Sequence, residues 1–252
     1  MTTEAAPATS LVAVRLAGPV ARITVGNGQR RNALTMAGWA ELERVVDELG
    51  TQERVRAVLV SGHGDTFCAG SDISEWLDAD AELVEESFAR MEAAFQAIER
   101  CPVPVVAEIR GAAAGAGCQL ALACDMRYLA GSARIGMPIA RLGILATPAF
   151  ATRLTALAGP AVARELLYTG ELLTGPAAQA AGLVNHCVPD AELHDAVHAA
   201  LDRICAQPTP TVRAAKRAVA AALAPMREAT AHNDLPAVSM DDFAAAVKAF
   251  LH

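Results

Sequence analysis

The chain has 252 residues, of which 53% are apolar and 19% charged, and its formal net charge is −7. This balance excludes an intrinsically disordered chain, because disorder goes with few apolar residues and a high net charge. An acidic chain also argues against a polyanion-binding role, so we expect no nucleic-acid partner. Gly, Gln, Arg or Asp interrupts every apolar run before the roughly 18 residues of a membrane-spanning helix, so we expect no membrane insertion.

The N-terminal segment and the cysteines indicate the cellular compartment in which we expect the protein. The first ten residues, MTTEAAPATS, have neither a basic start nor an apolar stretch, so they predict a disordered lead-in over 1–10 and no secretory signal. The six cysteines are scattered, lie mostly in apolar runs and form no CxxC pair. Buried thiols in a reducing cytoplasm fit this pattern better than disulfides or zinc ligands do. We therefore expect cytoplasmic localisation and no bound metal.

Strands and helices alternate along the first half of the chain. The patterns predict strands at 11–16 and 20–25, a helix capped by Thr35 and ended by Gly50, strand 55–60, a Gly-rich loop over 61–71, helix 81–100, strand 105–109, a tightly packed helix over 111–124 and strand 125–130. The alternation argues for an α/β fold with a largely parallel sheet.

The second half is predominantly helical. Thr147 and Pro148 form a good N-cap and first-turn pair, and Gly-Pro or Val-Pro steps punctuate the helices that follow. Only 183–188 is typical of a strand. We therefore expect a helical C-terminal region attached to an α/β core.

Glycine-rich stretches do not fit a nucleotide-binding motif. Gly26-Asn27-Gly28 has Arg31 where a third glycine belongs, and Gly115-Ala116-Gly117 has Leu120 there. These departures argue against a nicotinamide or flavin site, and the chain contains neither a P-loop nor a GxSxG nucleophile motif.

Two other polar features favour a structural role. His194 and His198 stand one helical turn apart, but with no third ligand nearby a solvated helix face is favoured over a metal pair. Cys68 would need a neighbouring base to act as a nucleophile, and His63 lies five residues back. A packed thiol is therefore favoured at Cys68.

Two stretches of small residues are more informative. They are FCAGSDI at 67–73 and IRGAAAGAGCQL at 109–120, and both suit a close approach of backbone to another group. The second also places unpaired N–H groups at a helix N-terminus. Two such groups that converge form an oxyanion hole. Either stretch alone is explained as well by packing of a helix against a sheet.

Three further motifs accompany these stretches: RNAL at 31–34, AAGLVN at 180–185 and the closing DFAAAVKAF at 242–250. Together they resemble the crotonase (enoyl-CoA hydratase/isomerase) superfamily, from about Val12 to Leu251. The resemblance implies a ββα spiral core over 11–190 and a helical C-terminal region over 191–252. That region drives trimerisation in the family, so the resemblance implies a homotrimer or a dimer of trimers.

The same resemblance implies an acyl-CoA or carrier-bound thioester substrate, with no cofactor other than the CoA of the substrate itself. The thioester carbonyl would lie between the backbone N–H groups of Ser71 and Ala116, with substrate contacts extending over 71–74. For Arg31, a contact with the CoA phosphates and a solvated cation remain open. The substrate-binding positions implied are Arg31, Ala69, Ser71, Asp72, Ile73, Ser74 and Ala116.

The chain departs from the family at the two glutamates that hydratases use as acid and base. They fall at Gln119 and Ile139. Glutamine can orient a water molecule but cannot accept a proton near neutral pH, and isoleucine can do neither. General acid–base help is worth roughly 10²–10⁴ per group, so we expect the loss of both glutamates to remove most of the standard hydratase activity. By motif alignment, Gln119, Ile139, Arg141 and Leu145 define a largely apolar acyl pocket.

Three functions remain open. The first is a lyase or isomerase of the enoyl-CoA hydratase/isomerase type whose base lies elsewhere, with Asp72, Glu75, His63 and Thr147 as candidates. The second is decarboxylation of a malonyl-type thioester, which yields the enolate without a base. The third is an acyl-thioester-binding protein without catalysis. The intact loops favour the first two.

Overall fold

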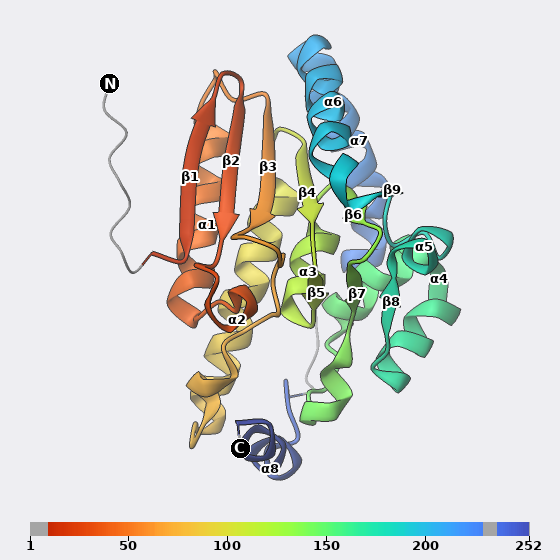
Figure 1. Ribbon diagram of the computed structural model, residues 1–252. Coiled ribbons are helices and arrows are strands. Elements are labelled where there is room, and N and C mark those ends of the chain that lie inside the picture. The colour runs from red at the N-terminus through yellow and green to blue at the C-terminus, as the bar shows by residue number, and fades with distance from the viewer. Residues whose placement is uncertain (1–9, 229–235, 252) are drawn as a thin grey trace.

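The structure, a computed structural model, describes residues 10–228 and 236–251 (Figure 1). All of the expected lead-in except Ser10 lies outside these residues. The strands are β1 (Val12–Ala17), β2 (Val20–Val25), β3 (Ala57–Gly62), β4 (Val105–Ile109), β5 (Ala112–Ala114), β6 (Met126–Ala130), β7 (Arg134–Gly136), β8 (Leu172–Thr174) and β9 (His186–Val188).

Helices of very different length connect the strands. The α-helices are α1 (Met36–Thr51), α2 (Ala81–Arg100), α3 (Ala116–Ala123), α4 (Pro148–Thr169), α5 (Gly175–Ala180), α6 (Leu193–Ala206), α7 (Thr209–Glu228) and α8 (Met240–Leu251). Short 3-10 helices are η1 (Gln29–Asn32), η2 (Ile73–Trp76), η3 (Pro138–Leu142) and η4 (Asp190–Glu192).

Two sheets form the centre of the molecule. The larger sheet has the order β1-β2-β3-β4-β6-β9, in which β1 pairs antiparallel with β2 and all other pairs are parallel. The smaller sheet has the order β5-β7-β8. Because β5 follows β4 almost directly, the chain passes from the larger sheet to the smaller one within a few residues. This crossing brings the loop after β3 close to the start of α3.

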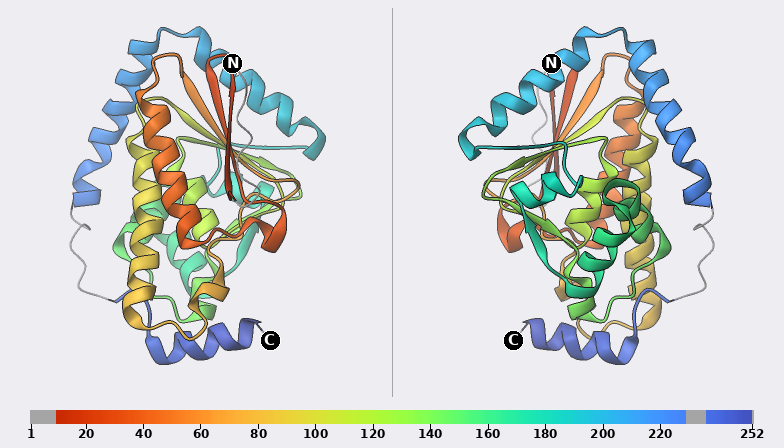
Figure 2. Two further views of the ribbon diagram at one scale, coloured as in Figure 1. Left: turned by 90° about the vertical axis from the view of Figure 1, so that its left-hand side faces the viewer. Right: turned by 90° about the vertical axis from the view of Figure 1, so that its right-hand side faces the viewer.

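Helices cover both faces of the larger sheet. Helices α1 and α2 pack side by side on one face, and α6 contacts β3, β4 and β6 on the other (Figure 2). Helix α7 returns along the side of the molecule, where Lys216 Nζ donates to the carbonyl of Val103 at 3.1 Å and to Asp125 at 2.7 Å. Helix α8 lies across one end, against η2 and η3. The core between these layers is mostly aliphatic and aromatic, with a few buried polar side chains such as Gln119 and Arg127.

Several sequence predictions are confirmed, including the α/β fold class. The helix over 81–100 and the strand over 105–109 match α2 and β4. The hydroxyl of Thr35 accepts a hydrogen bond from the Gly38 amide at 3.1 Å, and Thr147 accepts one from the Phe150 amide at 3.3 Å. Both helix starts were predictable because capping depends on residues only three apart.

Other predictions are wrong in detail. A single helix over 111–124 does not form: β5 comes first, and α3 begins only after Gly115, whose φ is 55°. Strands β7 and β8 were missed because three residues are too short to show a period. The strand expected over 183–188 shortens to β9, and α1 extends one residue past Gly50.

The six cysteines are all free thiols, and four of them are buried. Burial raises the pKa of Cys68, Cys118 and Cys124 to about 12 in each case. Within the described residues, no helix is both long and apolar enough to cross a membrane.

Candidate active site

The first segment of the site follows β3 and is held between two neighbours. Cys68 forms a parallel bridge with Ala113 of β5, and Ser71 forms one with Leu34. The Leu34 amide donates to the Gly70 carbonyl at 2.9 Å. These contacts on both sides fix the backbone of 68–71 without help from a regular strand.

The second segment is the start of α3, and it approaches the first through glycines. A Cβ atom at Gly117 would lie 2.0 Å from the carbonyl oxygen of Cys68, so only glycine fits there. Gly70 has a φ of 109°, and a Cβ at this position would lie 3.2 Å from the amide nitrogen of Ala116. The small residues are therefore required by a close contact between the two segments, as the sequence analysis expected of such residues.

The amides of Ser71 and Ala116 have no acceptor within the described residues. Ala116 is the first residue of α3, where an N–H group has no partner inside the helix and the helix dipole favours negative charge. Both residues are partly buried and line the same cavity. Partly buried donors without acceptors are suited to bind an oxygen atom of a ligand.

The Ser71 side chain is held in the core. Its hydroxyl accepts a hydrogen bond from Trp39 Nε1 at 3.0 Å and donates to Met91 Sδ at 2.8 Å. Trp39 is fully buried and packs edge-on against Phe95, with ring centroids 5.3 Å apart. The hydroxyl is thus engaged with core groups, which fixes Ser71 beside the cavity.

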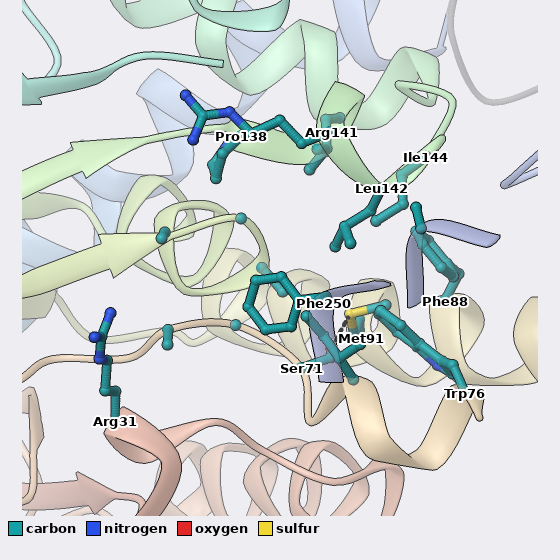
Figure 3. A pocket seen from close by; sticks show the side chains of 18 of the residues that line it. Arg31, Ser71, Trp76, Phe88, Met91, Pro138, Arg141, Leu142, Ile144 and Phe250 are labelled. Atoms are coloured by element: carbon teal, nitrogen blue, oxygen red, sulfur yellow. Dashed lines mark hydrogen bonds between the residues drawn. The ribbon is translucent and has the colours of Figure 1, made fainter. Parts of the chain in front are cut away.

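The cavity has a volume of about 480 Å³ (Figure 3). Within the described parts of the chain, Arg31 and Arg141 are the only ionisable residues that line it. Of the positions singled out from sequence, the lining includes Arg31, Ala69, Ser71, Ile73, Ala116, Ile139 and Arg141. It does not include Asp72, Ser74, Gln119 or Leu145.

Comparison with known proteins settles the family. A family model described as enoyl-CoA hydratase/isomerase matches residues 16–245. The chain belongs to this family. Short-chain-enoyl-CoA hydratase of Clostridium acetobutylicum is 32% identical over 205 residues, which are 80% of this chain and 78% of that protein. Crotonyl-CoA hydratase of Syntrophomonas wolfei is 34% identical over 202 residues, covering 79% and 77%.

Solved structures of the enoyl-CoA hydratase/isomerase family share the fold. The crystal structure of an enoyl-CoA hydratase/isomerase from Mycobacterium paratuberculosis matches with a TM-score of 0.87 and 26% identity, over 95% of this chain and 98% of that one. The crotonase-like core inferred from the short motifs is therefore confirmed.

Gln119, one of the two positions where the resemblance places a glutamate, is fully buried and turned away from the cavity lining. Its Nε2 donates to the Phe150 carbonyl at 3.3 Å, and its Oε1 accepts from Arg153 Nη1 at 3.5 Å. Ile139 does line the cavity, with an apolar side chain. Neither position offers a proton-transfer group to the cavity.

A buried ion cluster lies behind Gln119. Arg153 of α4 donates to Glu92 at 2.7 Å and to Glu99 at 3.0 Å, and Arg227 of α7 donates to Glu99 at 3.1 Å. Burial lowers the pKa of the Arg153 guanidinium, but Glu92 and Glu99 raise it by more, so the net shift is upward. Arg153 is therefore a permanent cation next to Gln119. Sequence analysis missed this cluster because its ion pairs join residues that are 54, 61 and 128 positions apart.

The four residues considered as alternative bases all lie outside the cavity lining. Asp72 caps η2 through the Ser74 amide at 3.0 Å and pairs with Arg30. Burial raises the pKa of Asp72, but Ser74 and Arg30 lower it by more, so it falls below 3.8. The carboxylate of Glu75 accepts from the Met36 amide at 2.7 Å, and burial raises its pKa. Thr147 is a helix cap, and His63 also stays outside the lining.

The remaining candidates serve structure. The fully buried Cys68 thiol, with its raised pKa, is not poised as a nucleophile. His194 and His198 lie on the opposite face of the sheet, with ring centroids 4.2 Å apart and Arg22 against His198. Across residues 10–228 and 236–251, no group of three or more His, Cys, Asp or Glu side chains is arranged to hold a metal ion.

Proposed function

We propose that this chain is an enzyme that binds an acyl-CoA or carrier-bound thioester and holds its carbonyl oxygen with the amides of Ser71 and Ala116. The proposal is supported by two amides from separate segments that have no acceptor among the described residues and whose residues line one cavity. The hydratase relatives, whose names specify enoyl-CoA or crotonyl-CoA, support a thioester substrate. No cofactor beyond the CoA of the substrate is part of the proposal.

The two amides act on charge that develops during the reaction. When an enolate forms next to a thioester, negative charge moves onto the carbonyl oxygen. Donors already fixed in place stabilise this charge more than they stabilise the ground state, so the barrier falls. The dipole of α3 adds to the effect at Ala116. Arg31 and Arg141 supply positive charge at the cavity for the anionic parts of the substrate.

The reaction is of the enoyl-CoA hydratase/isomerase type in that it passes through this enolate. Protein side chains that line the described cavity include no carboxylate, imidazole or thiol, so proton exchange at the substrate carbons falls to water or to the substrate. This absence specifically favours a second candidate, decarboxylation of a malonyl-type thioester. There the bond from Cα to the carboxylate breaks, its electrons form the enolate, carbon dioxide leaves and water protonates Cα.

Removing one amide tests the proposal. Ala116→Pro deletes the N–H group at the first position of α3, where proline fits a helix. We expect kcat to fall about 10²–10³-fold, while Ala116→Gly, which keeps the N–H group, stays close to the original chain. Turnover is measured with crotonyl-CoA, a 3-enoyl-CoA and methylmalonyl-CoA. Equal rates for the proline and glycine variants would refute the role of this amide. Rates no higher than in buffer for the original chain would refute catalysis and leave thioester binding as the function.

Assembly and localisation also remain proposals. The homotrimer or dimer of trimers implied by the resemblance fits the exposed apolar side of α7, where Val219 is 62% exposed. Sedimentation of the full chain would measure the assembly directly. Cytoplasmic localisation rests on the reduced thiols.

A further inference from the structure

The end of the cavity away from Arg31 is lined by aromatic rings (Figure 3). Trp76 of η2 stacks on Phe88 of α2 with ring centroids 5.7 Å apart, and Phe88 stacks on Phe150 at 6.4 Å. Each of the three residues is at most 7% exposed. Their packing fixes this wall, so it cannot easily rearrange to admit a group of different chemistry.

The polar groups in and beside this wall already have hydrogen-bond partners within the protein. Trp76 Nε1 donates to Ser87 Oγ at 3.1 Å, and the Phe150 carbonyl accepts from Gln119. Met91 Sδ accepts from the Ser71 hydroxyl. The guanidinium of Arg141 points away from Trp76 and Phe88 (Figure 3). A carboxylate or hydroxyl at the far end of an acyl group would therefore lose its water here without gaining a partner from this wall, which opposes binding.

Helix α8 closes the same end from outside. The ring of Phe243 lies 5.3 Å from that of Trp76, and the Ser239 amide donates to the Gly143 carbonyl at 3.2 Å. Helix α8 contributes Ala246, Ala249 and Phe250 to the lining. The two alanines leave space where larger side chains would fill it, and Phe250, 66% exposed, lies at the rim.

We infer that this site selects thioesters whose acyl group is bulky and apolar at its far end, and that Ala249 on α8 sets the length it accepts. The inference rests on the proposed function, because the amides of Ser71 and Ala116 fix where the acyl chain begins. Burial of each methylene is worth about three- to fourfold in affinity. Affinity therefore rises with chain length until the acyl group meets α8.

Binding of saturated thioesters tests the inference without turnover. Calorimetry on the full chain measures Kd for acetyl-CoA, hexanoyl-CoA, octanoyl-CoA and glutaryl-CoA. We expect octanoyl-CoA to bind at least about tenfold more tightly than acetyl-CoA. Glutaryl-CoA, close in size to hexanoyl-CoA but with a distal carboxylate, should bind at least about tenfold more weakly than hexanoyl-CoA.

A matched pair of variants assigns the selection to α8. Ala249→Phe fills the lining from an exposed position, whereas Ala245→Phe adds the same ring at an exposed position of α8 outside the lining. We expect Ala249→Phe to weaken octanoyl-CoA at least about tenfold and acetyl-CoA less than about twofold, and Ala245→Phe to change neither.

The outcomes separate the two proposals. If every thioester binds with equal affinity, or glutaryl-CoA matches hexanoyl-CoA, acyl selection is wrong while thioester binding stands. If Ala245→Phe acts like Ala249→Phe, the role of Ala249 is wrong. If no thioester binds at all, the proposed function itself fails.

Discussion

The two sides of the candidate site are built by different means. On one side, backbone amides of Ser71 and Ala116 are placed by glycines that let two segments meet. On the other side, Gln119 and Ile139 occupy the positions where the resemblance places two glutamates. An amide is available at any residue except proline, so its placement depends on backbone geometry, whereas proton transfer depends on particular side chains. The first can therefore be intact where the second is absent.

The part of the site around Gln119 is nevertheless held by specific interactions. Arg153, bound to Glu92 and Glu99, donates to Gln119 and so helps hold that side chain away from the cavity. Gln119 thus belongs to the packing between α2, α3 and α4. Substitutions on each side in turn measure which side contributes more to the stability of the fold.

The largest effect is expected from Arg153→Met. This change removes the cation from a buried cluster. Among the described residues it leaves Glu99, whose side chain is 10% exposed, paired with Arg227, whose side chain is 40% exposed. Losing one partner of a buried ion pair costs about 3–5 kcal/mol, and urea unfolding measures it.

The control is Arg90→Met, which removes an exposed pair with Glu86 that is worth about 0.3–0.5 kcal/mol. A loss below about 1 kcal/mol for Arg153→Met would mean that the cluster is readily replaced by apolar packing.

This cluster also shows what could not be predicted from the sequence. The helix over 81–100 was predictable from periodicity and two prolines, because those signals are local. The pairing of its Glu92 and Glu99 with Arg153 was not, because it depends on how α2 and α4 pack. The amide segments were found through motifs, while the aromatic wall depends on the packing of Phe150 of α4 against Phe88 of α2, a contact between residues far apart in the sequence.

A smaller effect is expected on the amide side, from Gly117→Ala. Its methyl group would lie 2.0 Å from the Cys68 carbonyl, so the two segments must move apart. Overpacking of this kind costs about 1–3 kcal/mol, and displacement of Ala116 should lower turnover as well.

Gly131→Ala is the matched control, since its methyl group would meet the Val188 carbonyl at an ordinary 3.5 Å. Thermal unfolding compares the two variants. Equal midpoints would mean that the 68–71 segment shifts without cost, contrary to the tight placement argued for the amides.

The smallest effect concerns Asp72, which follows Ser71 and holds the next turn in place. Its cap on the Ser74 amide and its pair with Arg30 predict that Asp72→Ala costs about 1 kcal/mol. Because the pKa of Asp72 is held below 3.8 in the folded chain, the unfolded chain binds the proton more readily in acid. The stabilisation is therefore fully present above the pKa that Asp72 has in the unfolded chain, and it is lost as pH falls through the lower pKa of the folded chain. Asp72→Asn keeps a capping oxygen without the charge, so between pH 6 and pH 3 it should lose less stability than the original chain. If both proteins lose the same stability between pH 6 and pH 3, the carboxylate does not stabilise the turn beside Ser71. The placement of the Ser71 and Ala116 amides would then depend on the glycines alone.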